Sequence, residues 1–231
     1  MSIVWDKLED CQHRITELLD KHCSPVEDAE LERFNQPENG WINLVWNSKD
    51  VRRAHVDVVD ARSTKRLWMM HVCVFPVLDN DSPIYGFDVI AGENKITGAF
   101  HDFSKSSGPT DHSLYTWYEE AVAEYIPTKK RKLPEWAENI FSPSMIAAGN
   151  VSNVDEIDSI VDYAVENLEV YLESLAQYSD TADRAATANA QDYYCENQQQ
   201  NPHTPRVMKS LGLSDEDVEI FCRDVLFPKI T

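Results

Sequence analysis

The chain has 231 residues, of which 42% are hydrophobic and 26% are charged, proportions that are ordinary for a folded globular protein. Its 21 Lys and Arg against 40 Asp and Glu give a formal net charge of −19, which argues against general nucleic-acid binding because a phosphate backbone would be repelled. No apolar run approaches a membrane span and the N-terminus lacks the layout of a signal peptide, so a cytoplasmic protein without membrane contact is expected.

The chain opens with a predicted helix, because apolar residues recur there at helical spacing with polar residues between them. These are Leu8, Cys11, Ile15, Leu18 and Leu19. The Pro/Asn/Gly-rich stretch Asn35–Gly40 follows and predicts a turn.

A block of strands comes next. Apolar, aromatic and β-branched residues are concentrated in Trp41–Trp46, Ala54–Val59, Leu67–Phe75, Ile84–Ala91 and Lys95–Phe100. The connections between these segments are short, as at Gly92–Asn94, and leave no room for crossover helices. The pattern therefore indicates antiparallel pairing of successive strands.

The second half is predicted to be mainly helical. An apolar stripe runs through Ile157–Leu175, and Asn153 with Glu156 resembles a capping box at its start. The polar stretch Asp180–Gln200 fits either a helix or a loop beside a site, and Ser214 is predicted to cap a last helix. Strands in one block with helices around them indicate an α+β fold, and the length suits a single domain over residues 1–231.

Four ionisable residues interrupt the apolar strands: His55, Asp57, His71 and Asp88. His55 and Asp57 are two apart, so a strand would place both on one face. Burying such a group without a partner costs on the order of 2–7 kcal/mol, and adjacent antiparallel strands could supply one by pairing His71 with Asp88. Two kinds of site fit the four residues. One is an acid/base site, and the other is an iron site with His55, His71 and Asp88 as ligands.

Common cofactor motifs are absent. The sequence contains no G-x-G-x-x-G, no Walker loop and no G-x-S-x-G, and its five cysteines include no C-x-x-C pair. Nucleotide cofactors, serine hydrolysis, zinc ribbons and iron–sulfur clusters are therefore disfavoured. The basic run Lys129–Lys132 fits either a solvated loop or a docking patch for an acidic partner.

Four segments carry a resemblance to a known family. Arg53–Asp57, His71–Pro76, Tyr85–Gly92 and Tyr194–Asn201 resemble the ferredoxin-dependent bilin reductases, and most of all their phycocyanobilin-forming branch. The resemblance implies a three-layer α/β/α sandwich with a central antiparallel sheet. It also implies that biliverdin lies between the sheet and the C-terminal helices, that no metal, flavin or nicotinamide is bound, and that electrons come from a [2Fe–2S] ferredoxin.

The resemblance assigns catalytic roles by position. Asp88 matches the central aspartate that protonates the substrate, and His71 matches the histidine that contacts the D-ring lactam and shares a proton with that aspartate. His55 matches the second histidine of the proton network. Asp57 stands where phycocyanobilin-forming members carry a glutamate that serves reduction of the D-ring vinyl group.

Substrate-binding residues are assigned in the same way. Thr97 falls where a propionate-binding serine is expected, Gln198 falls in a substrate-lining glutamine run, and Asn201 lies near the A-ring side. His203 lies in the segment where the phycocyanobilin branch has an Asp-Lys pair. A propionate-binding arginine expected near residues 147–149 is missing.

These departures alter the D-ring machinery and bring the chain closer to the phage-type phycoerythrobilin synthase branch. The expected reaction is a four-electron reduction of biliverdin IXα to phycoerythrobilin through 15,16-dihydrobiliverdin. Reduction to phycocyanobilin is the alternative, and a bilin carrier is the non-enzymatic one. Biliverdin, ferredoxin and a phycobiliprotein lyase are the expected partners of a monomeric protein.

Overall fold

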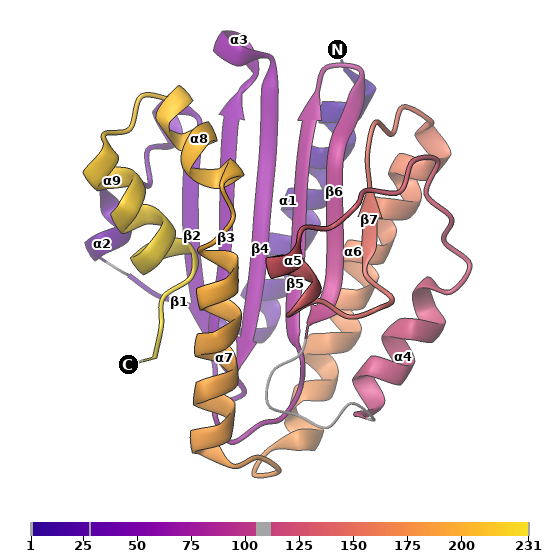
Figure 1. Cartoon of the computed structure of the whole chain (residues 1–231), viewed down its shortest axis with the longest axis vertical. Helices are drawn as coiled ribbons and strands as arrows, with labels where there is room; N and C mark the ends of the chain where they lie inside the picture. Colours follow the sequence, from indigo (N-terminus) through magenta and orange to yellow (C-terminus); the bar gives the residue numbers. More distant parts are fainter. Residues whose placement is uncertain (1, 28, 105–111, 231) are drawn as a thin grey trace.

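The computed structural model describes residues 2–27, 29–104 and 112–230 (Figure 1). Its described strands form one seven-stranded antiparallel sheet in which spatial order follows chain order, from β1 to β7. The strands are β1 Ser24–Pro25, β2 Trp41–Asn47, β3 Val51–Ala61, β4 Leu67–Pro76, β5 Ile84–Gly92, β6 Lys95–Ser104 and β7 Ile146–Ala148. The five strands predicted from sequence are confirmed, and the second of them is longer at both ends than Ala54–Val59.

Helices precede, interrupt and follow this sheet. The α-helices are α1 Ile3–His22, α2 Ala29–Glu32, α3 Arg62–Lys65, α4 Ser113–Val122, α5 Glu135–Glu138, α6 Val154–Ser174, α7 Arg184–Gln198, α8 His203–Ser210 and α9 Asp215–Ile220. Short 3-10 turns are η1 Pro37–Asn39 and η2 Leu175–Tyr178, and α9 continues into the π-helical segment η3 Phe221–Leu226. None of the helices in the described ranges is long and apolar enough to cross a membrane.

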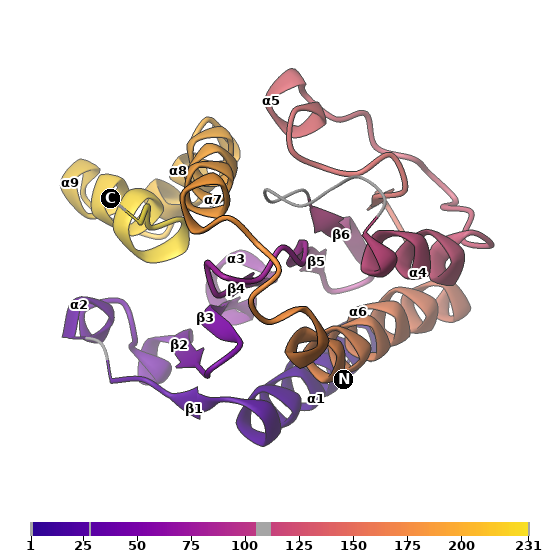
Figure 2. The same cartoon turned by 90° about the horizontal axis from the view of Figure 1, so that it is seen from below.

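The elements form three layers (Figure 2). Helices α1, α4 and α6 lie on one side of the sheet, and α5, α7, α8 and α9 lie on the other. We name these sides the back face and the front face of the sheet, the front face being the one toward the viewer in Figure 1. The arrangement confirms the predicted α/β/α sandwich with a central antiparallel sheet.

The back face is an apolar layer. On β3 the back-face residues Val56 and Val58 are buried, and they alternate with His55 and Asp57 on the front face. Helices α1 and α6 cover the back face with buried apolar stripes at helical spacing. Ion pairs between the two helices add to this packing, among them Arg14 with Asp162.

Capping residues define the helix ends much as predicted. The Asn153 side chain accepts hydrogen bonds from the backbone N–H groups of Asp155 and Glu156, and Ser214 accepts one from Asp217. The Glu156 carboxylate does not complete a capping box, because it accepts from the Thr128 backbone and hydroxyl instead. The stretch Asp180–Gln200, predicted to be either a helix or a loop, is largely helix α7.

The predicted turn before β2 fixes where that strand begins. Gly40 has a φ of 78°, in the left-handed region that glycine adopts without steric cost. A Cβ at Gly40 would lie 2.3 Å from the backbone oxygen of Asp60, so only glycine allows this approach of β2 to β3. The next residue, Trp41, is thereby placed at the start of β2, beside the polar residues of β3.

Candidate functional site

Strands β2 to β5 each place one polar side chain at the same level of the front face. Asn43 pairs in register with Asp57, Asp57 with His71, and His71 with Asp88. Because residues opposite each other on neighbouring strands share a face, the four side chains form one row across the sheet. His55 precedes Asp57 by two residues and lies on the same face. The pairing of His71 with Asp88 predicted from sequence is confirmed as strand register.

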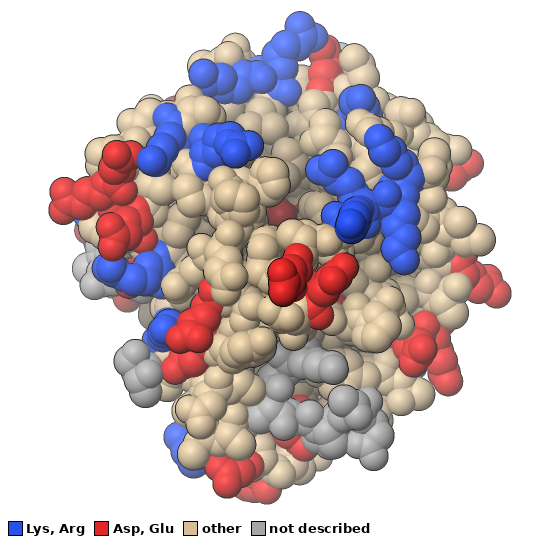
Figure 3. All heavy atoms as spheres, in the orientation of Figure 1, with Lys and Arg blue, Asp and Glu red and all other residues tan. Residues whose placement is uncertain are grey.

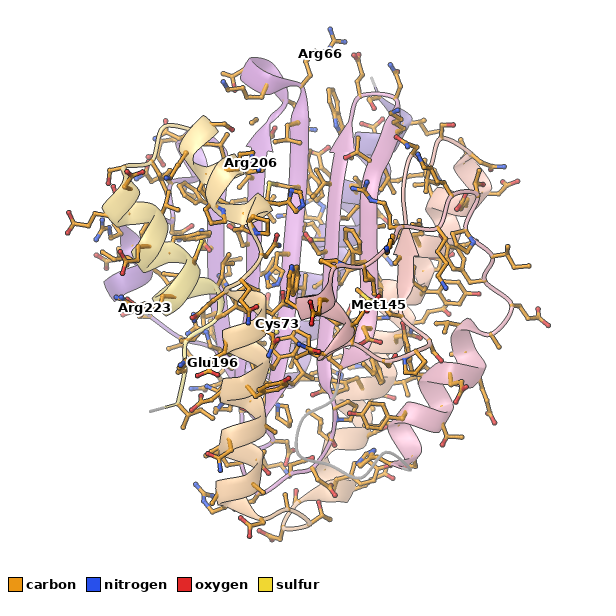
Figure 4. The ribbon with its side chains drawn as sticks, viewed as in Figure 1. Arg66, Cys73, Met145, Glu196, Arg206 and Arg223 are labelled. Atoms are coloured by element: carbon orange, nitrogen blue, oxygen red, sulfur yellow. The ribbon has the colours of Figure 1, made fainter. Side chains whose placement is uncertain are left out.

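The row is buried at one end and open at the other. His55, Asp57 and Asn43 are at most 2% exposed, whereas His71 and Asp88 are partly exposed. Figure 3 shows the front face hollowed between groups of basic side chains on either side. Cys73, which Figure 4 labels on β4, pairs in register with His55 and lies two residues along β4 from His71.

Hydrogen bonds from β2 fix the buried end of the row. The Trp41 indole N–H donates to Asp57 Oδ1 at 2.8 Å. Asn43 Nδ2 donates to the Phe34 carbonyl at 2.9 Å, which leaves Asn43 Oδ1 as an acceptor 2.8 Å from His55 Nε2. His55 Nε2 therefore carries the proton of the neutral ring, and its Nδ1 is left as a proton acceptor.

Burial sets the protonation of the group. It raises the pKa of both Asp57 and Asp88 to about 7, and the Asp88 charge adds a small upward contribution at Asp57, against hydrogen bonds from Trp41 and Asn43. Burial lowers the pKa of His71 to about 4 and that of His55 well below its usual range. Near neutral pH the acidic protons that the site can donate are therefore on the carboxyl groups, and both imidazoles are neutral.

Two imidazole nitrogens of the site have unused hydrogen-bonding capacity. Within the described part of the chain, the buried Nδ1 atoms of His55 and His71 have no hydrogen-bond partner. The ring of His71 packs edge-on against Phe227, with ring centroids 5.3 Å apart, and this contact covers it from the C-terminal segment. Leaving a buried polar atom without a hydrogen bond costs about 1–3 kcal/mol of folding free energy. Such atoms are typical of positions where a bound ligand supplies the missing partner.

Helix α7 covers the sheet beside the row. Gln198 is buried and its Nε2 donates to the Tyr194 hydroxyl at 2.8 Å. That hydroxyl lies 3.6 Å from where a Cβ at Gly86 would stand, so α7 packs directly against β5 at this residue. Gln198, predicted to line the substrate, thus belongs to the covering layer of the front face.

Asn201 and His203 lie at the turn from α7 to α8. Asn201 Nδ2 donates to the Thr204 hydroxyl at 3.3 Å, and its Oδ1 accepts from the backbone N–H of His203 at 3.0 Å. His203 is exposed and begins α8, the helix on which Figure 4 labels Arg206. These hydrogen bonds of Asn201 stay within this turn and do not connect it to the row on β2 to β5.

Thr97 lies at an irregularity of β6 near a basic side chain. The register between β5 and β6 shifts there, and the Thr97 hydroxyl donates to the Ile90 carbonyl at 2.9 Å. The Arg131 side chain crosses two glycines beside it. Its Nη2 lies 3.5 Å from a Cβ built at Gly98, and its Cδ lies 2.8 Å from one built at Gly149. The exposed guanidinium of Arg131 therefore reaches the front face at residues 98 and 149.

The backbone explains how the basic run Lys129–Lys132 comes to lie there. Arg131 N–H donates to Ala147 O, Gly149 N–H donates to Lys129 O, and Lys130 forms a bridge with Ala148. The run therefore extends the sheet beyond β7 and is not a detached loop. Because alternate residues of an extended chain share a face, Lys129 and Arg131 point to the same side.

Sequence reasoning missed Trp41, Asn43 and Arg131 as members of this region. Asn43 carried a usable signal, because it is an amide within the otherwise apolar segment Trp41–Trp46 and sits at the same parity as Trp41. Trp41 had no such signal, since a tryptophan at a strand start is common. Arg131 could not be located without knowing that its segment pairs with β7.

Two further findings concern a possible metal site and a second hollow on the surface. In the part of the chain that the structure describes, no group of three or more His, Cys, Asp or Glu residues is arranged to hold a metal ion, so the His55, His71 and Asp88 of the iron alternative do not form such a group. A surface hollow of about 420 Å³ lies between the ends of α1 and α6 and the β2–β3 turn, but its lining includes no residue of the row. The chemistry of the row makes it the better candidate.

Comparison with known proteins gives one family over almost the whole length. Residues 8–228 match the family described as ferredoxin-dependent bilin reductase. A phycocyanobilin:ferredoxin oxidoreductase from Gloeobacter violaceus is 29% identical over 189 residues, covering 80% of this chain and 73% of that protein. One from Synechococcus elongatus is 29% identical over 198 residues, covering 80% and 74%.

Solved structures resemble the fold as well. A protein named PcyX is 39% identical, covers 97% of this chain and 99% of its own, and superposes with a TM-score of 0.73. Phytochromobilin synthase from tomato, in complex with biliverdin, has a TM-score of 0.72 at 14% identity, covering 95% and 82%. At that identity the tomato protein is a likeness of fold alone.

Proposed function

Since the chain belongs to the ferredoxin-dependent bilin reductase family, we propose that it reduces biliverdin IXα by four electrons to phycoerythrobilin, with 15,16-dihydrobiliverdin as the intermediate. Ferredoxin supplies the electrons, and the front-face row supplies protons. The observation that carries this proposal is the row itself, in which two carboxyl groups flank His71 in strand register.

The row suits stepwise proton delivery. Each carboxyl group has its pKa raised by burial to about 7, close to the pH at which a general acid both holds and releases a proton. The extended tetrapyrrole delocalises an added electron, so the protein needs proton donors and a site shielded from water. Asp88, the partly exposed carboxyl, is the donor nearest the hollow. His71 contacts the lactam of the D-ring. His55 belongs to the buried part of the proton network.

Polar groups around the row suit the ends of a bilin. The solved structure of the tomato protein contains biliverdin, which makes this ligand the natural one to consider. We assign Arg131 and Thr97 to a propionate, because the guanidinium reaches the front face over Gly98 and Gly149. Arg131 would then replace the arginine that the family resemblance led us to expect near residues 147–149. Gln198 lines the covering side, and Asn201 with His203 lies toward the A-ring end.

The product follows from the reach of Asp57. Aspartate is one methylene shorter than glutamate, so its carboxyl group sits on the order of 1.5 Å further from the D-ring vinyl group. Proton transfer requires heavy atoms within about 2.6–3.2 Å, and the carboxyl is also bound to Trp41 on β2. The bilin radical then takes its proton at the neighbouring methine bridge. Two electrons and two protons give 15,16-dihydrobiliverdin, and two more of each reduce the A-ring diene.

The charge distribution supports docking of ferredoxin at the front face. Lys129–Lys132 are all exposed in the segment that pairs with β7, and Arg131 reaches the front face from it, whereas α6 on the back face carries seven Asp and Glu and no Lys or Arg. An acidic partner would be attracted to the first surface and repelled by the second. The protein is expected to act as a monomer and to pass its product to a phycobiliprotein lyase.

Anaerobic turnover with biliverdin and reduced ferredoxin, followed by chromatography of the bilins, tests the proposal. Phycoerythrobilin as the end product is the expected result, with 15,16-dihydrobiliverdin appearing first. Phycocyanobilin as the end product would overturn the assignment of Asp57. Binding of biliverdin without any reduction would leave a bilin carrier as the function.

A further inference from the structure

Trp41 contacts the site from outside the row. It is the first residue of β2, and its indole N–H donates to Asp57 Oδ1 at 2.8 Å. Asp57 is 1% exposed, so this bond lies in an environment where water does not compete strongly. The indole therefore holds one oxygen of the carboxyl group that distinguishes this chain from the glutamate-bearing branch.

The indole is itself held in place. Its ring lies 5.8 Å from that of Phe34 and 5.1 Å from that of Phe221, both in edge-on geometry. The turn at Gly40, which excludes a Cβ, fixes the backbone from which the side chain extends. The two aromatic rings and the tight turn keep the Trp41 indole in place, so it cannot follow the Asp57 carboxyl toward the bilin. The hydrogen bond therefore holds the carboxyl on the β2 side.

An indole N–H can only donate a hydrogen bond. Asp57 Oδ1 accepts this bond, and because the carbonyl oxygen of a carboxylic acid is a better acceptor than its hydroxyl oxygen, the indole favours a proton on Oδ2. In strand register Asp57 has Asn43 on one side and His71 on the other, so the fixed Oδ1 also limits how the carboxyl can turn between them. The orientation of the acid thus depends on a residue outside the row.

We propose that Trp41 is a positioning residue that retains the Asp57 carboxyl on the β2 side, directs its proton to Oδ2, and so keeps it from protonating the D-ring vinyl group. The inference rests on the proposed function, because it explains why Asp57 does not perform the glutamate's reaction. It assigns product specificity to a hydrogen bond as well as to the length of the side chain.

Titratable groups that face Asp57 can change its measured pKa when they gain or lose charge. His55, His71 and Asp88 lie on the same face of β3, β4 and β5, and Cys222 faces Asp57 from η3. Both imidazoles are neutral near pH 7 and the thiol pKa is raised by burial, so Asp88 is the one neighbour among these whose charge changes in the same pH range.

The first arm of the experiment measures the pKa of Asp57 in substrate-free protein. Carbon-13 carboxyl shifts are followed with pH in aspartate-labelled protein, and Asp57→Asn assigns the signal. Trp41→Phe keeps an aromatic ring between Phe34 and Phe221 but removes the donor, so the pKa of Asp57 should rise by about one. Incorporation of benzothienylalanine at position 41 keeps the ring size, removes the N–H and serves if Trp41→Phe folds poorly.

The chain offers a matched control. Trp46 is on the same strand and donates from its indole to Asp20 at 2.8 Å, away from the row. Trp46→Phe removes the same kind of bond, so it should lower stability without changing the pKa of Asp57 or the pH profile of turnover. An equal change of the Asp57 pKa in both variants would show a general effect of lost packing and would overturn the proposal.

The second arm measures products. Trp41→Phe should raise the fraction of phycocyanobilin several-fold, and the gain should disappear in the double variant Trp41→Phe, Asp57→Asn. An unchanged Asp57 pKa in Trp41→Phe, or a product shift that persists in the double variant, would overturn the role of Trp41. If the parent protein already forms phycocyanobilin, the proposed function fails, while the first arm still decides whether Trp41 orients Asp57.

Discussion

His101 on the back face of the sheet and His71 on the front face have different surroundings. His101 lies on the back face, where its Nδ1 is 2.8 Å from the Gly86 carbonyl and its Nε2 is 2.9 Å from Asn167 Nδ2. His71 lies on the front face, where its buried Nδ1 has no hydrogen-bond partner among the described residues. Burial lowers the pKa of both to about 4.

The comparison shows that a perturbed pKa does not by itself identify a functional residue. Both imidazoles are neutral for the same physical reason, yet His101 is fully bonded within an aromatic core that includes Tyr85 and Tyr118. A site is distinguished by polar atoms that the fold leaves unsatisfied and by titratable neighbours at the same level. Asp57 and Asp88 provide those neighbours on the front face only.

The largest expected effect is on turnover in Asp88→Asn. The variant keeps the size of the side chain but removes a proton donor, and general acid catalysis contributes about 10²–10⁴-fold, so biliverdin consumption should slow at least about 100-fold. Anaerobic assays with reduced ferredoxin measure the rate. Asp102→Asn is the matched control, because Asp102 is a buried front-face carboxylate that accepts hydrogen bonds from Ser104 and the Ser142 backbone. It should lose stability and keep the pH profile of turnover.

The next effect is on stability. The folded-state pKa of Asp57 is raised from 3.8 to about 7, so the folded state binds the proton more tightly and the cost of burial grows as pH rises through that range. Asp57→Asn should therefore be more stable than the parent by a margin that grows by up to about 3 kcal/mol between pH 5 and 8. Urea unfolding at both pH values measures it. A margin that does not change with pH would contradict the assigned protonation.

Replacing His101 or His71 by glutamine should have different effects on stability and turnover. His101→Gln should lower the free energy of unfolding by about 1–3 kcal/mol, since it disturbs two satisfied buried bonds, and should leave the pH profile of turnover unchanged. His71→Gln should slow turnover by about tenfold at little cost in stability, because the imidazole that can pass a proton to Asp88 is lost. Equal behaviour of the two variants in both assays would break the comparison between the faces.

The smallest effect is on the encounter with ferredoxin. Neutralising Lys129, Lys130 and Lys132 should lower the second-order rate with limiting ferredoxin by about tenfold at low salt and weaken its salt dependence. Arg131 is left in place because it is assigned to the substrate. Biliverdin affinity should stay the same, and an unchanged rate would move the docking surface to other basic residues of the front face, such as Arg206 or Lys209.

Much of the fold could be predicted because it depends on local patterns. The apolar, aromatic and β-branched residues around His71 and Asp88 predicted the strands, and short connections predicted their antiparallel order, from which the pairing of these two residues followed. The helical period of Ile157–Leu175 gave α6 in the same way. The composition of Asp180–Gln200 left helix and loop open, because its stripe facing the sheet includes polar residues such as Gln191 and Gln198.

The rest of the site depends on contacts between distant segments. Trp41 reaches Asp57 because Gly40 and the rings of Phe34 and Phe221 direct its indole, and no periodicity encodes that geometry. Arg131 reaches the front face because its segment pairs with β7. Product specificity, the role of Thr97 and the single-domain organisation stay predictions.

The central claim is that the front-face row delivers protons to a one-electron-reduced bilin. Electron paramagnetic resonance of Asp88→Asn, frozen at intervals after reduction of bound biliverdin by ferredoxin, tests it most directly. The account predicts a bilin radical that persists in Asp88→Asn and decays in the parent protein and in Asp102→Asn. A radical that decays in Asp88→Asn at the parent's rate would show that the proton comes from elsewhere and would contradict the account.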